Sequence, residues 1–247
     1  MRHLAMRARS LVRSALVAGV ISSAAPVVAQ EVDLPTLPDV GEGRGGLLAP
    51  SGWLVLNTPV RKSPVRPVDL KVYGFYIGGM GVPVGQVDVP IRAARFLTIT
   101  PSYMGYRVPA SGLNELTPEP GPFTDTYHEH QFRIDGTVAI PVRKLEVSVR
   151  NMYVRRFRPD GADDVNRYRG RIALAHPLTV GGKTLKPFAS YEAYYERDAG
   201  WNKDRLWTGF TLPITSRVLI QPSYMFEITT GSRDVHYLLF GLIVNTR

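Results

Sequence analysis

The sequence predicts an all-β protein, an antiparallel up-and-down transmembrane β-barrel of about 10–12 strands with a polar, charge-lined lumen. Three observations support this fold class. Apolar and polar residues alternate over segments of 11–15 residues, short turns and longer polar connections separate these segments, and residues 1–29 have the pattern of an export signal. Strands of soluble sandwiches average about 5–6 residues, whereas a tilted strand needs about 9–11 residues to cross a bilayer.

Residues 1–29 are expected to be a signal peptide. Four arginines fall within the first 13 residues, a short apolar stretch follows, and the sequence VVA before Gln30 offers a cleavage site after Ala29. Without these four arginines, 26 basic and 21 acidic residues leave a formal charge of +5. This mild excess gives little support to nucleic acid as a partner, so we expect none. The lack of cysteine excludes a disulfide framework and thiolate metal sites.

The mature chain is expected to consist of a leader and one domain. Residues 30–50 are rich in Pro, Gly and acidic residues and follow neither a 2.0 nor a 3.6 period, which predicts a flexible leader. Residues 51–247 are expected to form the β-barrel domain.

One hairpin plan recurs five times in this domain. Each copy ends a strand near a proline, makes a short turn, and returns as a strand that ends in an aromatic residue; the five prolines are Pro59, Pro90, Pro141, Pro177 and Pro213. Their spacing is too uneven for a solenoid repeat. Short turns on one side and longer connections on the other are typical of outer-membrane barrels. The longer connections are 108–126, 158–165, 197–202 and 229–233.

The dipeptide Gly181-Gly182 predicts the register of one hairpin. In a two-residue primed turn at this position, residues whose numbers sum to 363 face each other. The resulting pairs are Arg171 with Glu192 and Arg167 with Glu196 on the polar face, and Tyr168 with Tyr195 and Ile172 with Tyr191 on the apolar face. A slip of one residue would set the apolar face against the polar face.

The alternation separates two sets of candidate functional residues. The polar face carries a charge ladder that is expected to line the lumen: Arg133, Arg150, Arg156, Arg167, Arg169, Arg171, Glu192 and Glu196. The apolar face carries aromatic residues near the loop ends of the strands, as an interfacial girdle would: Tyr103, Tyr153, Tyr168, Tyr195 and Tyr224. Basic rings can select anions in a pore. Because acids alternate with the bases, a charge-paired lumen too narrow to conduct is the favoured interpretation.

The tetrapeptide PSYM occurs twice, at 101–104 and 222–225, with the proline and the tyrosine on the apolar face in both copies. Proline removes a donor from the strand ladder, so a β-bulge is expected at each copy. The strand count is a second open point. Five hairpins and a final strand give eleven, whereas bacterial barrels usually have an even number. Either the leader contains a twelfth strand, or residues 52–60 lie outside the barrel wall.

The ordered segments HEHQFRIDGTVAIP, RYRGRIALAHPL, KPFASYEAYY and HYLLFGLIV resemble the bacterial family known as domain of unknown function 2490. The cues are arginine alternation before a Pro-Leu turn, the Glu-x-Tyr-Tyr strand and the closing strand that begins with histidine. The resemblance covers roughly residues 51–245. It implies an outer-membrane-type barrel of unassigned function, with no catalytic residues to transfer.

Other chemistry receives little support. His128 and His130 share one strand face, but catalytic zinc needs three protein ligands and no third is visible, so no metal site and no cofactor are expected. Ser102 and Ser223 could act as nucleophiles with a base among the histidines at 128, 176 and 236, yet no spacing recommends a pair.

The predicted function is therefore an outer-membrane β-barrel of a Gram-negative bacterium, either structural or a narrow, weakly conducting, porin-like pore. Its expected partners are outer-membrane lipid and, during biogenesis, the barrel-assembly machinery; a small-molecule ligand is unknown. Two alternatives stay open. One is a lipid-modifying barrel enzyme, and the other is a soluble periplasmic barrel or sandwich that binds an apolar ligand.

Overall fold

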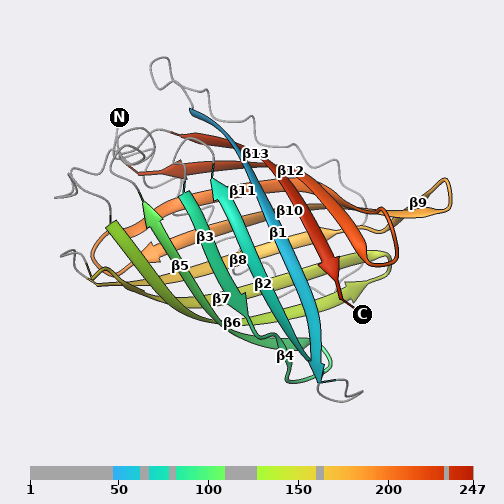
Figure 1. Ribbon diagram of the computed structural model, residues 1–247, viewed down its shortest axis with the longest axis horizontal. Coiled ribbons are helices and arrows are strands. Elements are labelled where there is room, and N and C mark those ends of the chain that lie inside the picture. The colour runs from blue at the N-terminus through green and yellow to red at the C-terminus, as the bar shows by residue number, and fades with distance from the viewer. Residues whose placement is uncertain are drawn as a thin grey trace, which may run out of the picture. The chain divides into compact units, whose positions relative to one another are not determined.

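The computed structural model describes residues 47–61, 67–77, 82–108, 127–159, 164–230 and 234–246 (Figure 1). The signal peptide and most of the expected leader lie outside these ranges, as do most residues of the connections 108–126 and 229–233. The described residues contain no helix that could cross a membrane. Their strands are β1 (Leu47–Arg61), β2 (Val68–Ile77), β3 (Val82–Asp88), β4 (Ile91–Arg92), β5 (Leu97–Val108), β6 (Tyr127–Val142), β7 (Leu145–Phe157), β8 (Val165–Ala175), β9 (Leu178–Val180), β10 (Lys183–Glu196), β11 (Gly200–Pro213), β12 (Val218–Thr229) and β13 (Val235–Asn245).

Eleven of these strands form a closed barrel wall in the order β1-β13-β12-β11-β10-β8-β7-β6-β5-β3-β2, and β2 pairs again with β1. The short strands β4 and β9 extend hairpins at the turn end. Neighbouring wall strands are antiparallel except β1 and β13, which pair in parallel over the register Leu47 with Val235 to Asn57 with Asn245. Figure 1 shows β1, in blue, between β2 and β13.

The parallel pair resolves the strand count. Each turn reverses the chain direction, so the first and last of eleven consecutive strands run the same way and can only close the barrel in parallel. The alternative that residues 52–60 lie outside the wall is therefore wrong, because they are part of β1. Most of the leader lies outside the described residues, and the strands of the described residues close the barrel without a twelfth. β1 also begins at Leu47, four residues before the expected boundary of the barrel domain.

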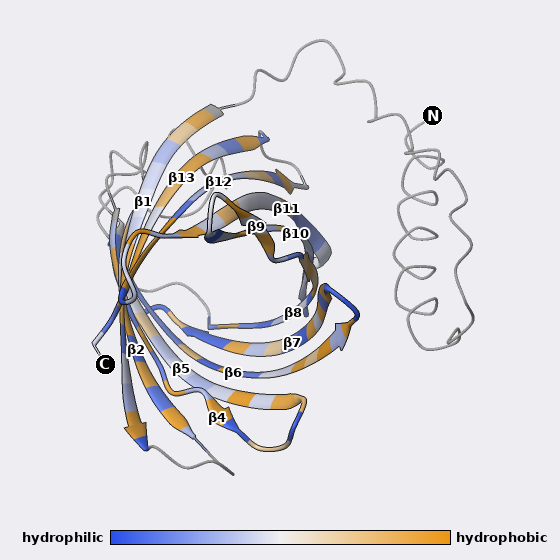
Figure 2. Ribbon diagram, turned by 90° about the vertical axis from the view of Figure 1, so that its right-hand side faces the viewer, coloured by the Kyte–Doolittle hydropathy of each residue, from blue (hydrophilic) through white to orange (hydrophobic). Residues whose placement is uncertain are grey.

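The predicted alternation is present along the wall (Figure 2). In β6, for example, Phe132 and Ile134 are more than half exposed on the outer face, whereas Arg133 and Asp135 are 7% exposed on the inner face. An outer surface of large apolar side chains around an inner charged surface is the pattern of a transmembrane barrel. The predicted fold class, with its polar and charge-lined lumen, is confirmed.

The primed turn and its register are confirmed as well. Gly181 and Gly182 have φ angles of 57° and 76°, a conformation that a type I′ turn needs at both positions and that glycine adopts without strain. The facing pairs follow the sum of 363 along the whole hairpin. They include Arg171 with Glu192, Arg167 with Glu196, Tyr168 with Tyr195 and Ile172 with Tyr191.

The two PSYM prolines leave the register unchanged. Pro101 lies opposite Ile134, and Pro222 lies opposite Phe240, within ladders that show no register shift. The predicted bulges are therefore absent at these positions. The strand pairing is instead interrupted on the opposite edge of each proline, toward which the missing N–H would have pointed. On that edge, β3 ends opposite Pro101, and the β11–β12 ladder has a gap opposite Pro222. The ladder loses pairing without inserting a residue.

The inner side of the β1–β13 junction is apolar and tightly packed. The Trp53 ring lies over its register partner Gly241, where an added Cβ would overlap the indole. Trp53 also meets Trp207 edge to face at 5.9 Å. Ala49, Val235 and Tyr237 form a buried cluster on the same side. The lumen side of this junction is thus filled by apolar groups, and most of the charged groups lie on the strands from β6 to β12, with Asp88 on β3.

Candidate functional site

The structure places all eight predicted ladder residues on the inner face of four successive wall strands. β6 contributes Arg133, β7 contributes Arg150 and Arg156, β8 contributes Arg167, Arg169 and Arg171, and β10 contributes Glu192 and Glu196. We call these residues and the charged groups that they contact the lumen network. It has three centres, each built on buried carboxylates.

The first centre lies near the loop end and is built on Glu129, which is fully buried. Arg156 donates to both carboxylate oxygens of Glu129, from Nε and Nη2, at 2.7 Å each. Arg158 Nε lies 3.4 Å from the same carboxylate. Arg156 Nη1 also reaches Glu196 at 3.2 Å, and Arg167 forms an ion pair with Glu196. Two carboxylates thus hold three guanidinium groups.

The second centre is built on Glu192, which is 6% exposed. Arg169 donates to it from Nη2 at 2.8 Å and from Nε at 3.2 Å, and the Tyr194 hydroxyl donates at 2.9 Å. Arg150 forms a further ion pair with it across the intervening strand β8. Although Arg171 is the register partner of Glu192, it forms no ion pair among the described residues, and the carboxylate is held by Arg150 and Arg169.

The third centre lies on β11 and β12, and its two cations, Lys203 and Arg205, were missed by the sequence analysis. Glu227, 5% exposed, accepts Lys203 Nζ at 2.8 Å and pairs with Arg205. Between this centre and the second lies the ring of Tyr194, which is 1% exposed. The Arg169 and Arg205 guanidinium carbons lie 4.6 and 5.0 Å from its centroid, within the range of cation–π attraction. The period-2 spacing of Lys203 and Arg205 in the sequence could have placed both side chains on the inner face.

The lumen network constrains the barrel energetically. Removing charges from water is costly, so a buried ion pair adds little net stability over apolar packing, but losing one partner costs about 3–5 kcal/mol. Because most of these side chains pair with more than one charged group, removing one of them leaves its partners with fewer ion pairs. The network can hold the strands β6 to β12 in one register and fill the space between them.

The five girdle tyrosines all lie on the outer face and are 38–48% exposed. Tyr153 donates to Asn166 at 2.7 Å, and Tyr168 donates to Asn151 at 2.5 Å, so these hydroxyls have partners on a neighbouring strand. Aromatic groups with a polar tip suit the boundary between lipid and water.

The PSYM tyrosines share a contact that the sequence analysis missed. Tyr103 Oη lies 2.6 Å from His130 Nδ1, and Tyr224 Oη lies 2.6 Å from His236 Nδ1. In both cases the histidine belongs to the next strand of the wall and points outward. The repeated tetrapeptide therefore marks two equivalent tyrosine–histidine pairs on the outer surface.

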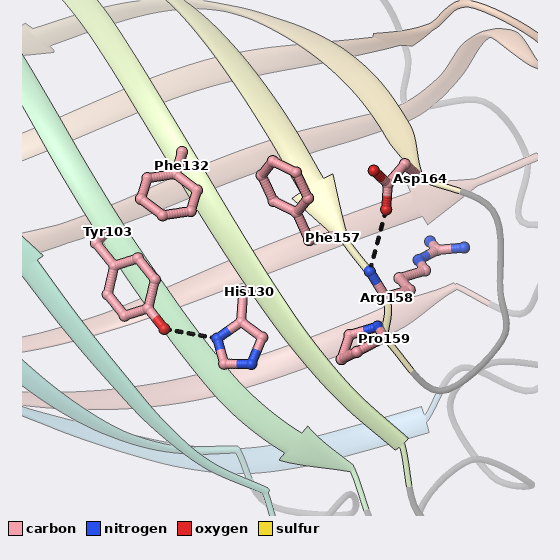
Figure 3. Close-up of a pocket in the computed structure, with 7 residues that line it drawn as sticks. All are labelled: Tyr103, His130, Phe132, Phe157, Arg158, Pro159 and Asp164. Carbon is pink, nitrogen blue, oxygen red and sulfur yellow. Dashed lines mark hydrogen bonds between the residues drawn. The ribbon is translucent and has the colours of Figure 1, made fainter.

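One tyrosine–histidine pair borders a shallow groove of about 450 Å³ (Figure 3). The groove is lined by Tyr103, His130, Phe132, Phe157, Arg158, Pro159 and Asp164. Its floor is aromatic, with Phe132 and Phe157 packed edge to face at 5.6 Å. Asp164 accepts the backbone N–H of Arg158 at 3.4 Å at the rim.

The candidate nucleophiles and bases lie apart. Ser102 and Ser223 point inward, and the Ser223 hydroxyl is buried without a hydrogen-bond partner. His130 and His236 point outward, and His176 Nδ1 lies 2.9 Å from the Lys144 carbonyl at the turn end. No group of three His, Asp or Glu side chains within the described ranges could hold a metal ion.

Comparison with known proteins identifies the family. The model of a protein family of unknown function, DUF2490, matches residues 87–236. The chain belongs to this family. The family resemblance inferred from the sequence is confirmed, over a shorter range than residues 51–245. A search of curated proteins gave no match.

Among solved structures, the chain is similar to two proteins at low sequence identity. One is a loop L8 deletion mutant of OmpT, an outer membrane protein of Vibrio cholerae, with 12% identity, a TM-score of 0.38, and coverage of 72% of this chain and 60% of that chain. The other is the β domain of the Bordetella autotransporter BrkA, with 14% identity, a TM-score of 0.43, and coverage of 71% and 81%. The chain thus spans less than two thirds of the OmpT variant.

Proposed function

We propose that this protein is an outer-membrane β-barrel, exported through its N-terminal signal, whose lumen is filled by ion-paired side chains. The barrel is then structural or a narrow, weakly conducting pore. One observation carries the proposal: each of four lumen carboxylates holds two cationic groups. These carboxylates are Glu129, Glu192, Glu196 and Glu227.

The reach of the ion pairs explains why the lumen would be closed to large solutes. Two arginines of β7, Arg150 and Arg156, contact carboxylates on β10. Because β8 lies between β7 and β10, these side chains pass over β8. A barrel of eight strands has an interior that side chains just fill, and wider barrels leave a channel unless long side chains or loops occupy it. Here the arginines extend inward and occupy the interior.

The outer surface supports lipid as the partner of this barrel. Its mid-strand residues are large and apolar, its loop-end tyrosines suit an interface, and the tyrosine–histidine pairs place further polar groups there. A barrel of this kind would reach the membrane through the barrel-assembly machinery. No nucleic-acid contact or cofactor is part of the proposal.

Membrane location is tested by fractionation of a Gram-negative host that expresses the full chain. We expect the mature protein in the outer-membrane fraction, with gel mobility that changes on heating, because a folded barrel resists detergent at low temperature. Recovery in the periplasmic soluble fraction would refute the proposal and favour the soluble barrel that binds an apolar ligand.

Conductance is tested with purified protein in planar bilayers. The wild type is expected to give no openings or small ones, and Arg150→Ala is expected to raise conductance because it removes a side chain that crosses the lumen. Arg171→Ala removes a charge from the same region. Arg155→Ala is the matched control, since Arg155 pairs with Asp164 on the outer face. Large, steady openings of the wild-type protein would show that the lumen is open.

A further inference from the structure

Three arginines in the middle of the lumen keep donors that their ion pairs leave unused. Arg133, Arg150 and Arg171 lie on the successive strands β6, β7 and β8, each near the middle of its strand. We call them the arginine cluster. Arg150 and Arg171 are direct register partners, so two like charges face each other on adjacent strands, an arrangement that destabilises a sheet unless another charge compensates it. Arg150 is also an electrostatic neighbour of Arg133.

The donors of this cluster are incompletely used. Within the described part of the chain, eight buried side-chain nitrogen and oxygen atoms have no hydrogen-bond partner, and four of them belong to these arginines. They are Nε and Nη2 of Arg133, Nε of Arg150 and Nε of Arg171. Arg133 is only 7% exposed, and a buried donor without a partner is costly, more so when it carries charge.

The neighbouring carboxylates do not satisfy these donors. Asp88 Oδ1 forms an ion pair with Arg133 Nη2 at 3.6 Å, which is too long for a hydrogen bond. Asp135 accepts the Thr137 hydroxyl at 3.0 Å, and Glu192 already accepts Arg169, Arg150 and Tyr194. With Arg169 included, four guanidinium groups face three carboxylates. The local charge balance is therefore positive by one.

We propose that the arginine cluster binds one small oxyanion, of the class of inorganic phosphate or sulfate, in the lumen. Guanidinium groups present planar pairs of N–H donors that match the oxygen atoms of such anions, and they do so more specifically than a point charge. The anion would accept the unused N–H groups and balance the excess charge between Arg150 and Arg171. The three side chains point inward from mid-strand, so the ligand comes from solution and not from a lipid headgroup.

The test is calorimetric titration of inorganic phosphate into the purified full-length barrel in a zwitterionic detergent and a chloride buffer free of phosphate. Saturable binding near one phosphate per chain is expected. Arg171→Gln should weaken it at least about tenfold, since a hydrogen bond to a charged group is lost. Arg155→Gln is the matched control and should bind as the wild type does, because Arg155 lies on the outer face.

A second variant keeps the test decisive if Arg171→Gln does not fold. Arg171→Lys keeps the charge but lacks the planar fork, and it should bind phosphate several times more weakly than the wild type. A short-chain phosphatidylglycerol should not compete with phosphate. No saturable binding to the wild type, equal weakening by Arg155→Gln and Arg171→Gln, or competition by the lipid would each overturn the proposal. Because binding is measured in detergent, its outcome is independent of membrane location and conductance.

Discussion

Glu129→Gln is expected to be among the most destabilising conservative substitutions in the barrel. Glu129 is fully buried and accepts two 2.7 Å hydrogen bonds from Arg156, a 2.5 Å bond from Gln131 and a longer contact from Arg158. Glutamine has the same shape but no charge, so Arg156 keeps only Glu196 as an ion-pair partner. Removing one partner from a buried ion pair lowers the free energy of unfolding by about 3–5 kcal/mol.

The chain offers a matched control for this substitution. Glu146 pairs with Lys186 at 2.6 Å, but both side chains are largely exposed, at 51% and 39%. An exposed pair contributes about 0–1 kcal/mol, so Glu146→Gln should change stability little. Urea unfolding of both variants in the same lipid vesicles, followed by tryptophan fluorescence, gives the two free energies. If Glu129→Gln cost no more than Glu146→Gln, the buried network would not be holding the barrel together.

Two further predictions concern the wall. Gly241→Val should lower the free energy of unfolding by about 1–3 kcal/mol, because the added side chain overpacks against Trp53. Gly136→Val should be tolerated, because an added Cβ there meets nothing within 4 Å. Heat-modifiable gel mobility of both variants checks this, and equal behaviour would contradict the packing at the β1–β13 junction. Ile134→Arg, at the middle of β6, should lower the free energy of unfolding in vesicles by about 2–4 kcal/mol. Val142→Arg, at the end of β6, should lower it by about 0–1 kcal/mol, because the cost of an outward charge depends on its depth in the bilayer. Equal and small costs in urea titrations would place both residues in water.

The faces of the strands could be predicted because side-chain direction in a strand is a local property. Period 2 decides which residues share a face, and this was enough to place all eight ladder residues inward and all five girdle tyrosines outward. The Gly181-Gly182 turn then fixed one hairpin register, because a primed two-residue turn allows only one pairing of the flanking strands.

The ion-pair partners could not be predicted in the same way. The register sets Arg171 opposite Glu192, yet Glu192 is held by Arg169 and Arg150, the latter from two strands away. Which long side chain reaches a carboxylate depends on strand tilt and barrel curvature, which no hairpin-level pattern contains. The parallel junction of β1 and β13 was missed for a different reason: the count of eleven strands implies it, but that count was set aside because bacterial barrels usually have an even number of strands.

The repeated PSYM sequence lies between these two cases. Its tyrosines could be placed on the outer face from alternation alone, but their histidine partners come from the neighbouring strand, 27 residues after Tyr103 and 12 residues after Tyr224. The unequal separations reflect the unequal loops that precede β6 and β13, so no fixed spacing could reveal the pairs. What repeats is therefore a two-strand unit, a proline and tyrosine on one strand and a histidine on the next. Such a unit becomes visible only when the wall has been assembled.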